Sequence, residues 1–179
     1  MMNTTLPQSN TAPACTALGS GVWLAFRHIA GTSAPAVPPP AAGAHLLSVE
    51  FCRRGRHALP AGDYCTIAAD GHAAVSMTAA GADDYYPGAV YEGLQFWIDP
   101  DAQTDSGFLA LMGLDVHGII NYFCAGGPYY GPMGDELAAL VDELWREFDV
   151  SGYASPGERR YAVVRLLYML LQLPYADQM

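Results

Sequence analysis

Residues 46–77, LLSVEFCRRGRHALPAGDYCTIAADGHAAVSM, and residues 86–99, YPGAVYEGLQFWID, determine the fold class of this chain. Short runs of β-branched, aromatic and aliphatic residues are separated there by Arg-Gly, Pro-Ala-Gly-Asp, Ala-Asp-Gly and Pro-Gly. Consecutive antiparallel strands joined by tight turns have this appearance in a sequence. We therefore expect a small antiparallel β-barrel or sandwich at the centre of the protein.

Alternation of residue types within these runs places the strands and their faces. In the segment 45–54, Val49 and Phe51 fall on one face and Glu50 and Cys52 fall on the other. The other expected strands are 21–29, 56–59, 64–68, 72–77 and 90–98, with a bend at Gly55 and turns at 60–63 and 69–71.

After residue 100 the apolar period lengthens from two to nearly four, which indicates helices. Ser155 and Glu158 form a capping box with Pro156 at the first helical position, a pattern that marks a helix start. The expected helices are 108–114, 115–123, 137–148 and 155–173, with a turn at 129–132.

Several of these features resemble the amino-terminal domain of AraC-type transcription regulators. They are the strand end FCRRGR at 51–56, the turn ADG at 69–71, the strand YEGL at 91–94 and the Gly-Gly turn at 126–127 between short and long helices. The resemblance extends over residues 20–175. It implies a mainly β fold with α-helices, namely a cupin-like antiparallel β-barrel that senses a small molecule, followed by a carboxy-terminal helical part.

The family's DNA-binding half, two helix-turn-helix units after the last helix, is missing because the chain stops at Met179. The resemblance thus implies the effector-sensing and dimerisation domain of such a regulator, which contacts DNA only through a domain missing from this chain. Within it we expect a flexible tail at 1–20, a barrel at 21–100 and a helical dimerisation and packing region of the same domain at 101–179.

Composition bounds the function independently of this resemblance. The 179 residues are 51% hydrophobic and 15% charged, as in a globular protein with one substantial core. Eight arginines, no lysine and 18 acidic residues give a net charge of -10, which disfavours binding to phosphates. The absence of lysine also excludes Schiff-base chemistry and a phosphate-loop lysine.

Targeting signals and cysteine spacing indicate a cytoplasmic protein. The first twenty residues contain no basic residue and no apolar run, which argues against a secretory signal. No window reaches the roughly 18 to 20 apolar residues that span a bilayer, so no membrane contact is expected. Four widely spaced cysteines, which should be reduced thiols, form no Cys-x-x-Cys pair: Cys15, Cys52, Cys65 and Cys124.

No catalytic constellation is present in the sequence. The five histidines show neither His-x-His nor His-Glu-x-x-His spacing, so we expect neither a metal nor another cofactor. There is also no Gly-x-Ser-x-Gly elbow, and no glycine-rich phosphate loop opens a helix after a strand. We therefore predict that the chain is not an enzyme.

A ligand site is expected where polar side chains point into the barrel, because an enclosed polar group needs a partner. The alternation nominates Glu50, Cys52, Tyr64, Glu92 and Trp97. Glu92 and Trp97 have opposite parity, so only one of them can point into a given cavity. With acidic candidates outnumbering basic ones, we expect a neutral or cationic, partly aromatic effector, although Arg54 at the rim leaves room for an anion. The alternative is a solidly packed barrel with Glu50 and Glu92 facing water.

The last helix suggests a partner. Between Tyr161 and Leu173 only Arg165 and Gln172 are strongly polar, so more than half of the circumference is apolar. Either the preceding helix covers this surface or a second protomer does. We predict a homodimer through the last helix, since a two-fold interface needs one self-complementary patch.

Two functions from other classes remain open. One is a stand-alone cupin enzyme such as an isomerase or dioxygenase, which metal analysis would detect. The other is a self-contained small-molecule-binding module. The effector, the regulated genes and the direction of regulation do not follow from the sequence.

Overall fold

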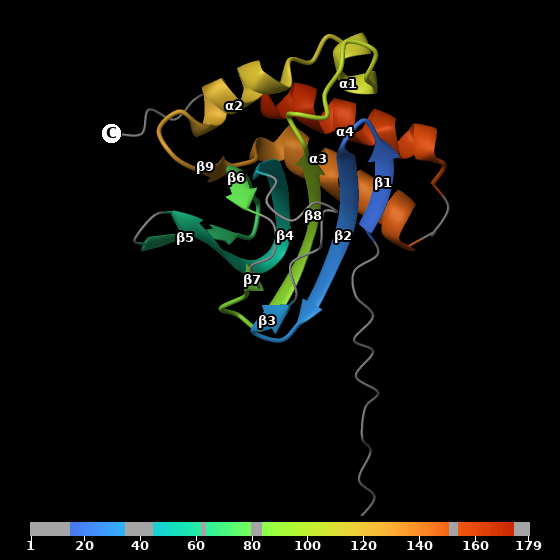
Figure 1. Ribbon diagram of the computed structural model, residues 1–179. Helices are drawn as coiled ribbons and strands as arrows, with labels where there is room; N and C mark the ends of the chain where they lie inside the picture. The colour runs from blue at the N-terminus through green and yellow to red at the C-terminus, as the bar shows by residue number, and fades with distance from the viewer. Residues whose placement is uncertain (1–14, 35–44, 62–63, 80–83, 151–153, 174–179) are drawn as a thin grey trace, which may run out of the picture.

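The computed structural model describes residues 15–34, 45–61, 64–79, 84–150 and 154–173. The strands are β1 (Cys15–Gly19), β2 (Val22–Ala30), β3 (Ser33–Ala34), β4 (His45–Ala61), β5 (Tyr64–Ala69), β6 (His72–Ala79), β7 (Asp84–Tyr85), β8 (Val90–Ile98) and β9 (Tyr129–Pro132). The helices are α1 (Phe108–Leu111), α2 (Val116–Cys124), α3 (Gly134–Leu144), the π-helix η1 (Trp145–Val150) and α4 (Pro156–Leu170) (Figure 1).

All strand pairs among these residues are antiparallel. The main sheet has the order β1-β2-β8-β4-β6-β9, while β5 and β7 also pair with β4 and β3 pairs with β7. The prediction of a mainly antiparallel β fold followed by a helical part is confirmed. The sheet is not closed, because its terminal strands β1 and β9 do not pair with each other in the described part of the chain.

Strand β4 gives the sheet its curvature. It runs for 17 residues, pairs with β6 and β8 before Gly55, and pairs with β5 after it. A register shift lies between Cys52 and Arg54, and Gly55 follows with a φ of 96°. A Cβ atom at Gly55 would lie 2.0 Å from the carbonyl oxygen of Val90, so only glycine fits. The predicted bend therefore exists, within one continuous strand.

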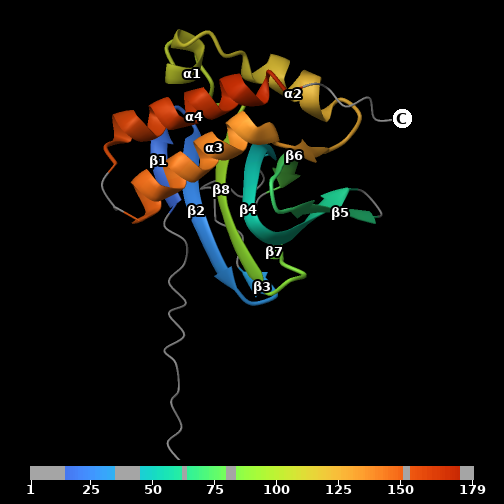
Figure 2. The same ribbon diagram turned by 180° about the vertical axis from the view of Figure 1, so that it is seen from behind.

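One face of the sheet packs against the helices, which cross it in a single layer (Figures 1 and 2). Val49 and Phe51 of β4 and Phe96 of β8 are fully buried there, as their alternation predicts. The helices contribute Ile119, Phe123, Leu137, Leu140, Leu144, Val163, Leu166, Leu167 and Leu170. This is the main hydrophobic core, and it holds the sheet against the helices.

Helix α4 begins as its sequence predicts. The Ser155 side chain accepts a hydrogen bond from the Glu158 amide, the Glu158 carboxylate accepts one from the Ser155 amide, and Pro156 occupies the first turn. Leu167 and Leu170 are both 0% exposed, because the sheet and neighbouring helices cover them. The apolar surface from which a homodimer was inferred is thus largely covered within the chain itself.

Two local predictions are wrong. Cys15–Gly19 lies within the expected tail but forms β1, paired with β2 across a turn in which Gly19, Ser20 and Gly21 all have positive φ. Its short CTALG sequence carries no strand pattern without that partner. Tyr129–Pro132, expected to be a turn, forms β9 against β6, with a proline tolerated at the sheet edge. Residues 1–14 lie outside the described residues.

Within the described ranges, every helix is too short or too polar to cross a bilayer.

Candidate ligand-binding face of the sheet

The face of the sheet opposite the helices carries buried polar side chains, which we call the inner face. In the strand register Arg27 of β2 lies opposite Gly93 of β8, and Gln95 of β8 lies opposite Glu50 of β4. Arg27 is 0% exposed and Glu50 is 1% exposed, which is rare for charged residues. The buried residues that form the inner-face cluster are Arg27, Ser48, Glu50, His57, Tyr86, Tyr91 and Gln95.

Glu50 is the centre of one half of this cluster. One carboxylate oxygen lies 2.7 Å from Nδ1 of His57, and the other accepts a 2.8 Å hydrogen bond from the hydroxyl of Tyr91. Burial, followed by the nearby charge of Glu50, raises the pKa of Tyr91 well above its ordinary value. Tyr91 therefore stays protonated and acts as a donor to the carboxylate.

A glycine makes this position of Tyr91 possible. The ring of Tyr91 lies over Gly93 of the same strand, and a Cβ atom at Gly93 would lie 2.3 Å from the tyrosine hydroxyl oxygen. The same Cβ would lie 2.8 Å from the carbonyl oxygen of Phe51 on β4. Glycine within a strand often marks such a close approach.

Arg27 is the centre of the other half. Its Nη1 donates a 3.1 Å bond to Oε1 of Gln95, whose Nε2 donates a 3.0 Å bond to the hydroxyl of Ser48. The guanidinium carbon lies 5.5 Å from the ring centroid of Tyr86. Tyr86 stacks in turn on His57, with centroids 4.8 Å apart and ring planes 19° apart. The two halves therefore form one connected cluster.

The structure brings together three of the five residues nominated from the sequence. Glu50, Cys52 and Trp97 are buried on the inner face, Trp97 at its end near Ala25 and Leu46. Glu92 has the opposite parity, as predicted, and binds Arg53 on the helix side. Tyr64 lies in β5, but its side chain falls outside the described residues. Glu50 does not face water.

Cys52 is a structural rather than a reactive thiol. It is fully buried beside Ile29, Tyr86 and Tyr91, and its Sγ lies 3.5 Å from the carbonyl oxygen of Gly55. Burial, followed by the charges of Glu50 and Asp70, raises the pKa of this thiol far above its ordinary range. The thiolate needed for nucleophilic chemistry is therefore disfavoured.

Sequence reasoning missed most of the inner-face cluster. Arg27 and Gln95 have the parity of the inner face on their own strands, so the alternation itself carried the signal. The position of His57 depends on the bulge before Gly55, which shifts the register of β4. Tyr86 precedes Pro87 and lies between two strands, where alternation gives no direction.

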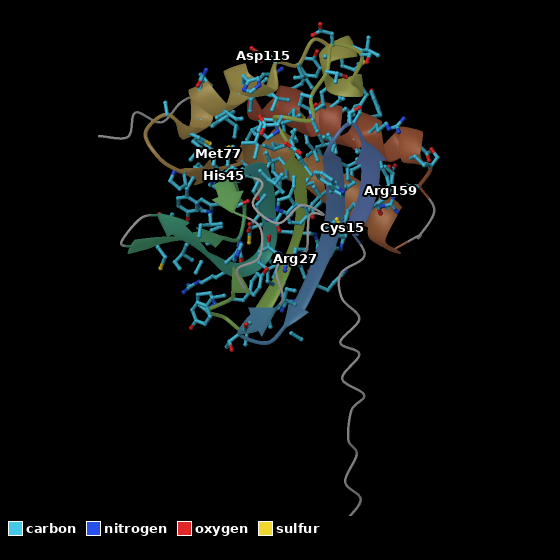
Figure 3. All side chains as sticks on the ribbon, viewed as in Figure 1. Cys15, Arg27, His45, Met77, Asp115 and Arg159 are labelled. Atoms are coloured by element: carbon cyan, nitrogen blue, oxygen red, sulfur yellow. The ribbon has the colours of Figure 1, made fainter. Side chains whose placement is uncertain are left out.

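A hollow lies at the helical end of the molecule. A cleft of about 380 Å³ separates the loop before α1 from the start of α2, with Gln103, Asp105, Asp115 and His117 in its lining. Figure 3 shows Asp115 well separated from Arg27, so this cleft and the inner face are different regions. No three His, Cys, Asp or Glu side chains of the described residues converge on a point where a metal ion could be held.

Comparison with known proteins supports the fold at low sequence similarity. Neither a protein-family model nor a curated protein sequence matches this chain. Among solved structures, it is similar to the crystal structure of the AraC-like transcriptional activator CuxR, with a TM-score of 0.53 and 12% sequence identity. The match covers 88% of this chain and 52% of that one. The chain thus has the fold of part of an AraC-like activator and spans about half of its length.

Proposed function

We propose that this chain is the effector-sensing domain of an AraC-type transcription regulator, and that a small molecule binds at the inner face of its sheet. The observation that carries this proposal is the buried inner-face cluster, on a fold shared with an AraC-like activator. Buried charged groups are expensive to desolvate, so an arginine and a glutamate enclosed together are better explained by recognition than by stability.

The cluster also favours a class of effector. Both oxygens of Glu50 already accept hydrogen bonds from Tyr91 or lie against His57, which leaves the carboxylate little capacity for a cation. The rings of Tyr86 and Tyr91 have their centroids 5.0 Å apart, and the guanidinium carbon of Arg27 lies 5.5 Å from the centroid of the Tyr86 ring. We therefore favour an uncharged effector with an aromatic ring and hydrogen-bonding substituents, over the cationic one also expected from the sequence.

Thermal denaturation with a library of neutral aromatic compounds tests this proposal. A binder should raise the Tm of the protein, and calorimetry should give one site per chain. Tyr91→Phe should weaken binding about fivefold, because a buried hydrogen bond is worth about 1 kcal/mol. Tyr122→Phe is the matched control, since Tyr122 is an exposed tyrosine on α2, outside the inner face.

Three results would count against the effector-sensing proposal. They are the absence of any binder, equal losses of affinity in Tyr91→Phe and Tyr122→Phe, and chemical conversion of the bound compound. Conversion, or metal found in purified protein, would favour the alternative of a stand-alone cupin enzyme.

Dimerisation and DNA contact are further parts of the proposal. The exposed face of α4 carries Tyr161 and Tyr168 seven residues apart, and Tyr168 donates a hydrogen bond to the carbonyl oxygen of Met112, next to the exposed Leu111. This exposed strip is the proposed homodimer contact, since Leu167 and Leu170 of the same helix are buried within the chain. Light scattering should show a dimer whose mass falls towards the monomer in Tyr161→Glu, and a monomeric wild type at high concentration would refute it.

The proposed DNA contacts are made by a domain outside this chain. The net charge of -10 opposes binding to phosphates, so we expect no tight, salt-resistant retention of a promoter fragment in a mobility-shift experiment. Such retention would contradict this assignment of roles.

A further inference from the structure

Arg53 joins the sheet to the helical layer through three contacts, which we call the Arg53 clasp. Its Nε lies 2.6 Å from Oδ1 of Asp142 on α3, and its Nη1 lies 2.8 Å from Oε2 of Glu92 on β8. Its guanidinium carbon lies 5.4 Å from the ring centroid of Trp145. One side chain thus connects β4, β8 and the end of α3.

The sheet end of this clasp is directly joined to the inner face. Cys52 precedes Arg53 in β4 and is fully buried against Tyr86 and Tyr91, while Glu50 lies two residues further back. The register shift between Cys52 and Arg54 lies at this point of the strand. An inner-face ligand that displaced Cys52 would therefore also displace Arg53, because one peptide bond joins the two residues.

The helix end of the clasp is an irregular segment. Trp145 is the first residue of η1, where α3 continues as a π-helix. It packs edge-on against Phe26 of β2, with centroids 5.8 Å apart, and lies 4.6 Å from the ring of His28. π-Helical turns are rare and frequently occur at functional sites.

We propose that the Arg53 clasp couples the inner face to the end of α3, so that a change at Glu50 alters the stability of the α3–η1 segment. The identity of the signal rests on the proposed function, but the coupling is a property of this chain alone. Coupling of this kind is a free energy: the effect of a change at the inner face on the α3–η1 segment must depend on whether the clasp is present.

Hydrogen exchange at the backbone amides of residues 142–148 tests the coupling without any ligand. Glu50→Gln alters the inner face, Arg53→Met removes the clasp, and the double variant completes the cycle. We expect Glu50→Gln to accelerate exchange in this segment about threefold or more, and to have no further effect once Arg53 is replaced.

Arg54→Met is the matched control. Arg54 is the next residue, is 65% exposed at its side chain, and approaches Glu92 only to 3.8 Å. Glu50→Gln should accelerate exchange in residues 142–148 as strongly in the Arg54→Met variant as in the wild type. Asp142→Asn breaks the clasp from the helix side and provides the same cycle if Arg53→Met fails to fold.

Additive effects of Glu50→Gln and Arg53→Met, or an equal loss of coupling in Arg54→Met, would overturn the clasp as the coupling element. A failed ligand search would overturn the proposed function and leave this cycle unaffected. Conversely, if a ligand binds but the effects of Glu50→Gln and Arg53→Met on hydrogen exchange are additive, the coupling is overturned and the proposed function is not.

Discussion

The two faces of the sheet are both buried, yet the buried charged side chains Arg27 and Glu50 lie on the inner face alone. On β4, Val49 and Phe51 face the helices and pack into an apolar core, whereas Glu50 between them faces Tyr91 and His57. The helix-facing side follows the rule that stability comes from apolar burial. The inner face departs from that rule at positions where apolar residues would be cheaper, and such departures are expected at functional sites.

This difference predicts unequal responses to substitution. Truncation on the helix-facing side should mainly cost stability. Changes on the inner face should cost less stability and should mainly alter binding and its dependence on pH.

Leu167→Ala should have the largest effect. Leu167 is fully buried between α4 and the rest of the core, and truncating such a leucine costs about 2 to 5 kcal/mol. Urea denaturation measures the loss. Val90→Ala is the control, because Val90 is 41% exposed, lies outside the proposed dimer contact and should change stability much less than Leu167→Ala. Equal effects of the two substitutions would show that α4 does not pack as described.

Tyr91→Phe should have a smaller effect on stability. It removes the hydroxyl that donates to Glu50 while keeping the ring over Gly93, which costs about 1 to 3 kcal/mol for a buried acceptor. The same denaturation series measures it. A loss as large as that of Leu167→Ala would mean that the inner face is also a principal source of stability.

Alkaline pH should separate the two faces further. The pKa of Tyr91 is raised in the folded protein, so an unfolded chain releases this proton near its ordinary pKa of about 10 while the folded chain retains it. This contribution to stability is full below pH 10 and is lost as pH rises above it.

Stability measured between pH 9 and pH 11 should therefore decline less steeply in Tyr91→Phe than in the wild type. Some decline should remain, because burial also raises the pKa of Cys15 and of Cys124 to about 11. Parallel pH profiles of the two proteins would contradict the placement of Tyr91.

Thiol labelling tests whether the inner face is closed to solvent, and it should perturb the protein least. Cys65 on β5 is exposed, whereas Cys52 is buried on the inner face with a raised pKa. A thiol reagent at pH 8 should modify Cys65 rapidly and Cys52 only on unfolding, which mass spectrometry of peptides resolves. Rapid labelling of Cys52 in folded protein would show that the inner face is open.

Local periodicity in the sequence predicted most of the fold. The alternation around Val49 and Glu50 predicted two faces, and the capping box at Ser155 predicted the start of α4. Strands β1 and β9 could not be predicted in this way, since each depends on a partner strand distant in the sequence.

The same limit applies to the site. Parity separated Glu50 from Val49 and Trp97 from Glu92, but it could not bring His57 to Glu50, because a bulge between them changes the register. The sequence also left open whether the preceding helix or a second protomer covers the apolar surface of the last helix, and in the structure Leu167 and Leu170 are covered within the chain. A pattern shows that a surface is apolar without showing what covers it.

A crystal structure of the protein with the tightest neutral aromatic binder tests the central claim most directly. The compound should lie on the inner face within hydrogen-bonding distance of Gln95 or Tyr91, in a complex that leaves the helix-facing core unchanged. A compound bound instead in the cleft beside Asp115 and His117, with the inner face packed solidly by its own side chains, would contradict the account.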